Sequence, residues 1–124
     1  TGGYAGVALD ILEAVNSTPT KRIVVSIQNP DTLDFLRPDD VIEISCDLSR
    51  DGLKPVTPVK VPTAQKNMIA CVKEYERLAV AAILQQDKSL AVRALMAHPL
   101  IGSYSLAKTL VEAYLDDEQF AAWR

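Results

Sequence analysis

The fold is decided by the stretch Tyr75-Glu76-Arg77-Leu78-Ala79-Val80-Ala81-Ala82-Ile83-Leu84, because its helical pattern loses its polar side halfway along. Apolar residues recur every three or four positions between Thr63 and Gln86, which predicts one long helix with Thr63 as its N-cap. Every residue from Leu78 to Leu84 is apolar. A helical segment without a polar face is buried all round. In a chain this small, such burial predicts neighbours for the segment, including another chain or another domain.

Two shorter helices are predicted after this one. Asp87 is placed to cap a helix that runs to Ala97, and Pro99 stops it. Ser103 can cap a further helix toward the end of the sequence. The only histidine, His98, lies at the end of the first of these two helices. An imidazole there can bond carbonyl groups of the last turn, so we expect a structural role for it.

The first half of the chain predicts one helix and a small sheet. Residues 5–15 carry apolar side chains at helical spacing. Lys21–Gln28 and Val41–Leu48 alternate between apolar and polar residues, as half-buried strands do. Arg50-Asp51-Gly52 predicts a hairpin turn, and the prolines that follow make the next strand short or confine it to an edge. No helix-length crossover separates the strands, so we expect them to be antiparallel.

The predicted fold class is therefore α+β, with four helices and a small antiparallel sheet of two or three strands. A chain of 124 residues can bury roughly two thirds of the surface that its unfolded form exposes. No Gly/Ser linker or internal repeat interrupts the sequence. We therefore expect residues 1–124 to form a single domain.

Composition limits the partners. The net charge is −3 and the basic residues are scattered, so a nucleic-acid partner is not expected. The longest apolar run falls far short of the roughly 20 residues that a membrane helix needs, and no leader-like segment opens the sequence. The sequence thus predicts a soluble, cytoplasmic protein without a membrane partner.

The residue types that carry chemistry form no complete set of nucleophile, base, metal ligands or phosphate loop. Cys46 and Cys71 occur without a CxxC motif or a histidine at metal-ligand spacing, so we expect two buried thiols. The carboxylates of Pro38-Asp39-Asp40 and Asp116-Asp117-Glu118 are expected to be solvated, because nothing supplies the apolar pocket that would raise a pKa.

Gly2-Gly3-Tyr4 precedes the first predicted helix. Backbone N–H groups and the positive end of a helix dipole suit an anion such as phosphate there. Two glycines also suit an ordinary helix start. The residues themselves favour the ordinary start and leave a ligand-facing loop open.

Three segments, in order, resemble the C-terminal region of glycoside hydrolase family 4, particularly its 6-phospho-β-glucosidase branch. They cover nearly the whole chain, and their order and spacing carry the resemblance rather than any single motif. The segments are Gly2-Gly3-Tyr4-Ala5 with Val7-Ala8-Leu9-Asp10, then Arg37-Pro38-Asp39-Asp40-Val41-Ile42-Glu43-Ile44, then Val72-Lys73-Glu74-Tyr75-Glu76-Arg77-Leu78 with Leu90-Ala91-Val92-Arg93-Ala94-Leu95-Met96-Ala97-His98-Pro99-Leu100.

The resemblance implies an NAD- and manganese-dependent enzyme that cleaves phosphorylated O-glycosides by oxidising C3, removing the C2 proton and eliminating the aglycone. Two catalytic carboxylates are not expected, because this family is an exception to that mechanism. The family's NAD-binding Rossmann domain, metal ligands and catalytic tyrosine lie upstream of the matched region. The chain would then be the substrate and oligomerisation half, with a fold similar to the second domain of lactate and malate dehydrogenases. Its partners would be a 6-phospho-glycoside, its own Rossmann domain and further copies of itself.

The resemblance also suggests which residues approach the substrate. Gly2, Gly3 and Tyr4 match the family's glycine-rich segment at the rim of the active site. The family commonly has Asn-Asn-Gly after the first strand, where this chain has Asn29-Pro30-Asp31, so Asn29 alone keeps the family residue. The expected substrate-binding residues are Gly2, Gly3, Tyr4 and Asn29. No catalytic or metal-binding residue is expected here, and this part alone is expected to be inactive and to bind neither NAD nor Mn²⁺.

Two alternatives stay open. The apolar half-helix from Leu78 to Leu84 also suits a non-catalytic homodimerisation or protein-interaction module. Relatives in the family act on α-glycosides, galactosides or uronic acids, and a shared fold does not choose among these sugars.

Overall fold

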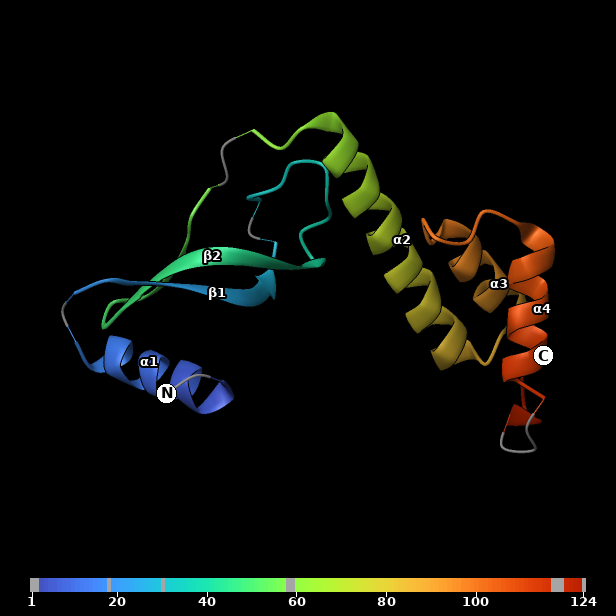
Figure 1. The fold of residues 1–124 in the computed structure, drawn as a ribbon, viewed down its shortest axis with the longest axis horizontal. Helices are drawn as coiled ribbons and strands as arrows, with labels where there is room; N and C mark the ends of the chain where they lie inside the picture. Colours follow the sequence, from blue (N-terminus) through green and yellow to red (C-terminus); the bar gives the residue numbers. More distant parts are fainter. Residues whose placement is uncertain (1–2, 18, 30, 58–59, 117–119, 124) are drawn as a thin grey trace. The chain divides into compact units, whose positions relative to one another are not determined.

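The computed structural model describes residues 3–17, 19–29, 31–57, 60–116 and 120–123. They fall into two compact units, unit 1 from Thr1 to Lys60 and unit 2 from Val61 to Arg124. Unit 1 holds a helix and the sheet, and unit 2 is helical (Figure 1). The elements in chain order are α1 (Tyr4–Asn16), β1 (Lys21–Gln28), β2 (Val41–Ser49), β3 (Gly52–Pro55), α2 (Thr63–Gln85), α3 (Lys88–Ala97) and α4 (Tyr104–Tyr114).

This architecture confirms the predicted α+β class, with four helices and a three-stranded antiparallel sheet among the described residues. The expectation of a single domain over residues 1–124 stays a prediction, as does the similarity to lactate and malate dehydrogenases. No helix in the described ranges combines the length and apolar character that crossing a bilayer requires.

The sheet of unit 1 has the order β1-β2-β3, and its register follows the alternation of side chains. Ile23 of β1 lies opposite Cys46 of β2, and Ile27 lies opposite Ile42. Cys46 and Ile42 are buried, while their partners on β1 are half-buried. Helix α1 contacts β2 and buries Ala14. The apolar face predicted for the first two strands therefore forms the core of unit 1.

The opposite face of the sheet faces solvent and carries a cross-strand ion pair. Arg22 lies opposite Asp47, and its Nε donates to Oδ1 at 2.8 Å while its Nη2 donates to Oδ2 at 3.1 Å. The hydrogen bond from the guanidinium is the main cause that lowers the pKa of the Asp47 carboxyl. This two-point geometry joins the two strands on the solvent side and is consistent with their register.

The predicted hairpin turn is confirmed at residues 50–52. Ser49 pairs with Gly52, whose φ of 111° is the left-handed conformation that favours glycine. Strand β3 is four residues long, ends at Pro55 and pairs with β2 alone. Proline has no N–H to donate to a further strand, so β3 is the short edge strand that the sequence predicts.

The helix boundaries of unit 2 are set by their caps. The N-cap of α2 is Pro62, so Thr63 is its first helical residue and not the predicted cap. Gln86 ends α2 in the left-handed conformation, with φ of 53°. Asp87 caps α3 as predicted, because its Oδ1 accepts from the N–H groups of residues 89 and 90 at 2.7 and 3.1 Å. Ser103 caps α4 as predicted.

The prediction that residues 78–84 are buried all round is wrong for this chain by itself. Ala82 is 2% exposed, whereas Val80, Ile83 and Leu84 are 56%, 63% and 79% exposed. Within unit 2, α3 packs against one side of α2 and reaches its small residues. Burying the larger side chains would need a further neighbour, because one helix covers only one side of another.

Two other expectations from the sequence need correction. Cys46 is fully buried, but Cys71 is exposed on α2, so only one of the two thiols is buried. His98 is the C-cap of α3, as expected, but its Nδ1 accepts from the Leu100 N–H at 3.2 Å instead of binding a carbonyl of the last turn. Its ring also meets Tyr75 edge-to-face, with centroids 4.8 Å apart.

Candidate functional site

The start of α1 carries two of the expected substrate-binding residues. Gly3 is the N-cap, with φ 92° and ψ −172°, a conformation that is almost restricted to glycine. Its carbonyl accepts from the N–H groups of Gly6 and Val7 at 3.0 and 3.3 Å. No side chain caps this turn of the helix. Gly2 lies outside the described residues, so its expected role stays a prediction.

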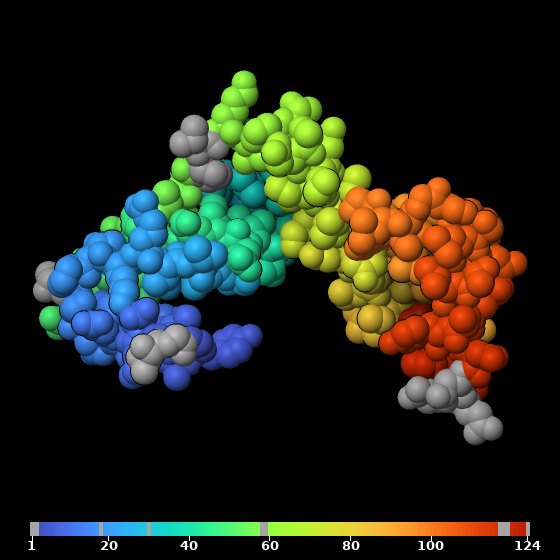
Figure 2. All heavy atoms as spheres, in the orientation of Figure 1, coloured from blue at the N-terminus to red at the C-terminus, as the bar shows by residue number. Residues whose placement is uncertain are grey.

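The surroundings of this helix start are open. Tyr4 is 96% exposed, and a Cβ placed on Gly3 would meet no atom within 4 Å. In the space-filling view the dark-blue start of α1 stands out from the rest of unit 1 (Figure 2). Gly3 is therefore required here by its backbone conformation and not by close packing.

Asn29 follows β1 and is buried, at 2% exposure. Its Nδ2 donates to the carbonyl of Leu33 at 2.9 Å, with longer contacts to Leu36 and Arg37 at 3.4 and 3.3 Å. Its Oδ1 accepts from the Leu33 N–H at 3.0 Å. The side chain thus uses both ends of its amide to hold the following loop. A direct contact between Asn29 and substrate stays a prediction.

Asp40 closes the same loop, and the sequence interpretation missed it. It was expected to be solvated with its neighbour, yet Asp40 is 6% exposed while Asp39 is exposed. Its Oδ2 accepts from the Arg37 N–H at 2.9 Å, and its carbonyl accepts from the Asn29 N–H at 2.8 Å. The turn signal Arg37-Pro38-Asp39-Asp40 could have identified it, because aspartate bonds its own backbone locally in turns.

These two places lie at the same end of unit 1. Helix α1 and strand β1 run in opposite directions, so the first turn of α1 and the residues after β1 point to one side (Figure 1). Lys21, at the other end of β1, binds Asp10 and Glu13 from the later part of α1. The structure therefore gathers Gly3, Tyr4 and the Asn29 loop on one end of the unit.

The groups at this end of unit 1 can be compared with those that metal chemistry needs. Within the described ranges, no three His, Cys, Asp or Glu side chains gather in a way that could hold a metal ion. Asp116 is exposed, and residues 117 and 118 lie outside the described part of the chain. The arrangement offers backbone N–H groups, an exposed phenol and a stiff loop. Such groups can position a ligand.

The comparisons with known proteins agree with a domain of a glycoside hydrolase. Residues 1–101 match the model described as "Family 4 glycosyl hydrolase C-terminal domain". The chain therefore belongs to glycoside hydrolase family 4 and corresponds to its C-terminal domain.

Two curated relatives are named as β-glucosidases for phosphorylated sugars. The 6-phospho-beta-glucosidase BglT of Thermotoga maritima is 30% identical to this chain over a match that covers 91% of this chain and 27% of the length of BglT. A probable 6-phospho-beta-glucosidase of Bacillus subtilis is 22% identical over 91% of this chain and 26% of its own. This chain thus spans about a quarter of the length of the curated relatives that it matches.

Solved structures show the same fold. A Thermotoga maritima 6-phospho-beta glucosidase with manganese, NAD⁺ and glucose-6-phosphate is 29% identical to this chain and has a TM-score of 0.78. The match covers 94% of this chain and 29% of the Thermotoga maritima chain. A 6-phospho-alpha-glucosidase from gut microorganisms, in complex with NAD and Mn²⁺, has a TM-score of 0.81 at 19% identity, over 98% of this chain and 28% of its own.

Proposed function

We propose that the chain is the substrate and oligomerisation half of an NAD- and Mn²⁺-dependent 6-phospho-β-glucosidase. Together with an N-terminal Rossmann domain, it would hydrolyse phosphorylated O-glycosides by oxidation and elimination. The observation that carries this proposal is the 30% identity to BglT across 91% of the chain. The Thermotoga maritima structure described with manganese, NAD⁺ and glucose-6-phosphate supports the cofactors and the phosphorylated sugar.

The residues of this chain have a positioning role in the proposal. The open helix start at Gly3 and Tyr4 would border the sugar pocket, where backbone N–H groups can face a phosphate. The Asn29 loop, held by the hydrogen bonds described above, would form a rigid wall beside it. NAD would supply the redox chemistry of the sugar. The metal would be held by the rest of the enzyme, as the family resemblance implies.

The β-configuration is favoured over the α-configuration by the identity to BglT alone. A phospho-alpha-glucosidase and a maltose-6'-phosphate glucosidase of Clostridium acetobutylicum are 22% and 20% identical to the chain, below BglT at 30% but level with or near the Bacillus subtilis β-glucosidase relative at 22%. The fold is shared by structures of both kinds and does not distinguish them.

The test is an activity assay on two proteins. The full product of the gene is assayed with chromogenic 6-phospho-β- and 6-phospho-α-glucosides, with and without NAD and Mn²⁺, and the present chain is assayed in parallel. We expect β-selective turnover that requires both cofactors in the full product and none in the chain alone. Failure to turn over any 6-phospho-glycoside would refute the proposal. Turnover by the chain alone would refute its dependence on a Rossmann domain.

A non-catalytic interaction module is the second candidate, and a specific observation favours it. Val80, Ile83 and Leu84 form an exposed apolar strip on α2, a surface that commonly marks a protein contact. Analytical ultracentrifugation of the chain, with Leu84→Lys as the variant, tests homodimerisation. A dimer that Leu84→Lys dissociates, together with an inactive full product, would favour the module over the enzyme.

A further inference from the structure

Asp40 is a buried acid at the end of the loop that follows β1. Its side chain belongs to a residue that is 6% exposed, whereas Asp39 beside it is exposed. Burying a carboxylate is costly unless hydrogen bonds replace its hydration. The hydrogen bonds that Asp40 makes therefore decide what it does in this loop.

Asp40 holds the two ends of a tight turn together. Its Oδ2 accepts from the Arg37 N–H at 2.9 Å, and its own N–H donates to the Arg37 carbonyl at 3.1 Å. Pro38 follows Arg37 in the sequence, at the position of a turn where the fixed φ of proline is favoured. One residue thus holds both polar groups of the Arg37 backbone.

The same residue ties this turn to the end of β1. The Asp40 carbonyl accepts from the Asn29 N–H at 2.8 Å, directly after the β1–β2 ladder. The Asn29 amide in turn donates to the carbonyls of Leu33 and Arg37 at 2.9 and 3.3 Å. Asp40 and Asn29 together therefore set the shape of the described part of this loop, residues 31–40.

This loop lies at the end of unit 1 that also carries Gly3 and Tyr4 (Figure 1). A binding wall that already holds its shape avoids the loss of affinity that comes from ordering a loop on binding. On the basis of the function proposed above, we infer that Asp40 is a positioning residue for the phosphorylated sugar. Its carboxylate keeps the loop in the shape that receives the sugar, and it does not touch the sugar itself.

A positioning role predicts a particular change in the kinetics. A loop that borders the sugar contacts the substrate and the transition state alike, so loosening the loop raises KM and leaves kcat unchanged. Lost stability acts differently, because it lowers the amount of folded enzyme and with it the apparent kcat, while KM stays the same. The split between KM and kcat therefore separates the two roles.

The full product of the gene is assayed with a chromogenic 6-phospho-β-glucoside in the presence of NAD and Mn²⁺. Asp40→Ala removes the acceptor for the Arg37 N–H, and KM should rise at least about fivefold, the equivalent of one hydrogen bond, with kcat within about twofold of the parent. Asp40→Asn keeps an oxygen acceptor and should return KM to within about twofold of the parent. Asp39→Ala, at the exposed neighbour, should leave both constants unchanged.

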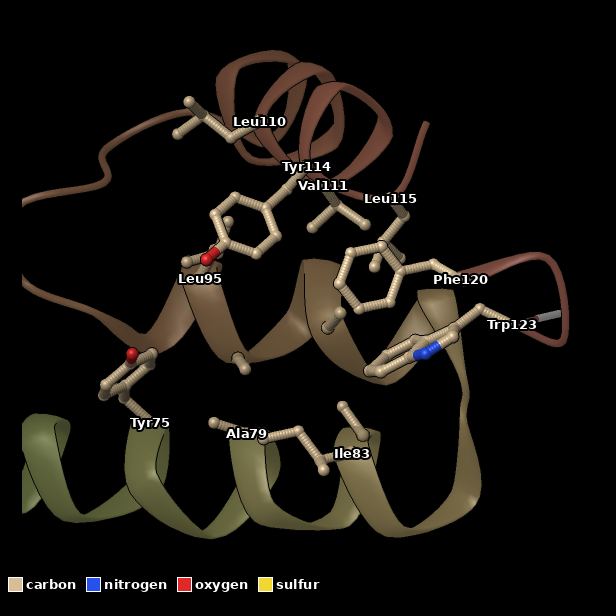
Figure 3. Close-up of a pocket in the computed structure, with 13 residues that line it drawn as sticks. Tyr75, Ala79, Ile83, Leu95, Leu110, Val111, Tyr114, Leu115, Phe120 and Trp123 are labelled. Atoms are coloured by element: carbon tan, nitrogen blue, oxygen red, sulfur yellow. The ribbon is translucent and has the colours of Figure 1, made fainter. Parts of the chain in front are cut away.

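Val111→Ala is the control for lost stability. Val111 of α4 is 6% exposed and lies among the apolar residues that line an open groove of unit 2 (Figure 3). Its truncation should lower the unfolding temperature and leave KM within about twofold of the parent. If circular dichroism shows that Asp40→Ala does not fold, Pro38→Gly loosens the same turn at an exposed position, and its KM, which should rise, decides the question.

The other results would overturn the positioning role, each in a distinguishable way. A parent that turns over no 6-phospho-glycoside would refute the proposed function and, with it, the role of Asp40. An active parent whose KM is unchanged in Asp40→Ala would refute the role of Asp40 alone. An equal rise of KM in Val111→Ala would assign the effect to lost stability. Failure of Asp40→Asn to restore KM would show that the hydrogen bond to the Arg37 N–H does not set the shape of the site.

Discussion

Replacing Asn29 by alanine should loosen the end of unit 1 that carries the candidate site. The substitution removes two well-formed hydrogen bonds, the donation to the Leu33 carbonyl at 2.9 Å and the acceptance from the Leu33 N–H at 3.0 Å. Each contributes about 1 kcal/mol, and the part-buried Leu33 N–H, which is left without its partner, costs about 1–3 kcal/mol more. Asn29→Ala should therefore reduce the free energy of unfolding of unit 1 by roughly 3–5 kcal/mol.

The assay must resolve the two units, because a chain of two compact units need not unfold in a single two-state step. Amide hydrogen exchange does this residue by residue. We expect faster exchange at the N–H groups of Leu33 and Arg37 and through the β1–β2 ladder, with α3 unchanged. Asn67→Ala, at an exposed position on α2, is the matched control and should change stability by less than about 0.5 kcal/mol. Unchanged exchange at Leu33 and in β1 after Asn29→Ala would refute the assigned role.

Three further predictions concern other parts of the chain. Gly3→Ala should lower the free energy of unfolding by about 1–3 kcal/mol or fray the first turn of α1, because any residue other than glycine is strained in the backbone conformation at this position. Thermal denaturation followed by circular dichroism measures this loss of stability, and an unchanged midpoint would contradict the prediction. The Arg22–Asp47 pair lowers the pKa of the Asp47 carboxyl, so its stabilisation is complete above the unfolded-state pKa of about 3.9 and is lost as the pH falls through the lower folded-state value. Urea unfolding between about pH 2 and pH 6 tests this, and Asp47→Asn should remove that part of the pH dependence. The exposed thiol of Cys71 should react quickly with an alkylating reagent in the native chain. Cys46 should react only after unfolding, because it is buried and because burial raises the pKa of its thiol. Mass spectrometry of the labelled peptides identifies which cysteine has reacted.

The elements themselves could be predicted from the sequence because local chemistry sets them. The alternation of Val41–Leu48 leaves one register in which its apolar face is buried, and Asp87 and Ser103 can satisfy the N–H groups of a following helix turn. These are interactions over a few residues, and the structure reproduces them. The family resemblance came from the order of the segments, and the match over residues 1–101 confirms it.

Burial and side-chain partners could not be predicted in the same way. Cys71 has the spacing of a buried helical residue, but which side of α2 is covered depends on where α3 packs. Asp40 looks like a surface turn residue until the loop closes over it. The role of Asn29 depends on carbonyl groups four to eight positions away. Each of these outcomes is decided by tertiary contacts, and a local sequence pattern carries no information about them.

The connections in Figure 1 also bear on how fast each unit assembles. In unit 2, the turn at Gln86 and Asp87 joins α2 directly to α3, so its helix contacts form between residues close in sequence. In unit 1 the β1–β2 pair nearest in sequence, Gln28 with Val41, is 13 positions apart and the farthest, Lys21 with Leu48, is 27 apart, so pairing first requires the closure of a loop. Because folding rates fall as contacts become more distant in sequence, unit 2 should acquire its structure first after dilution from denaturant, even though a ribosome would release unit 1 earlier.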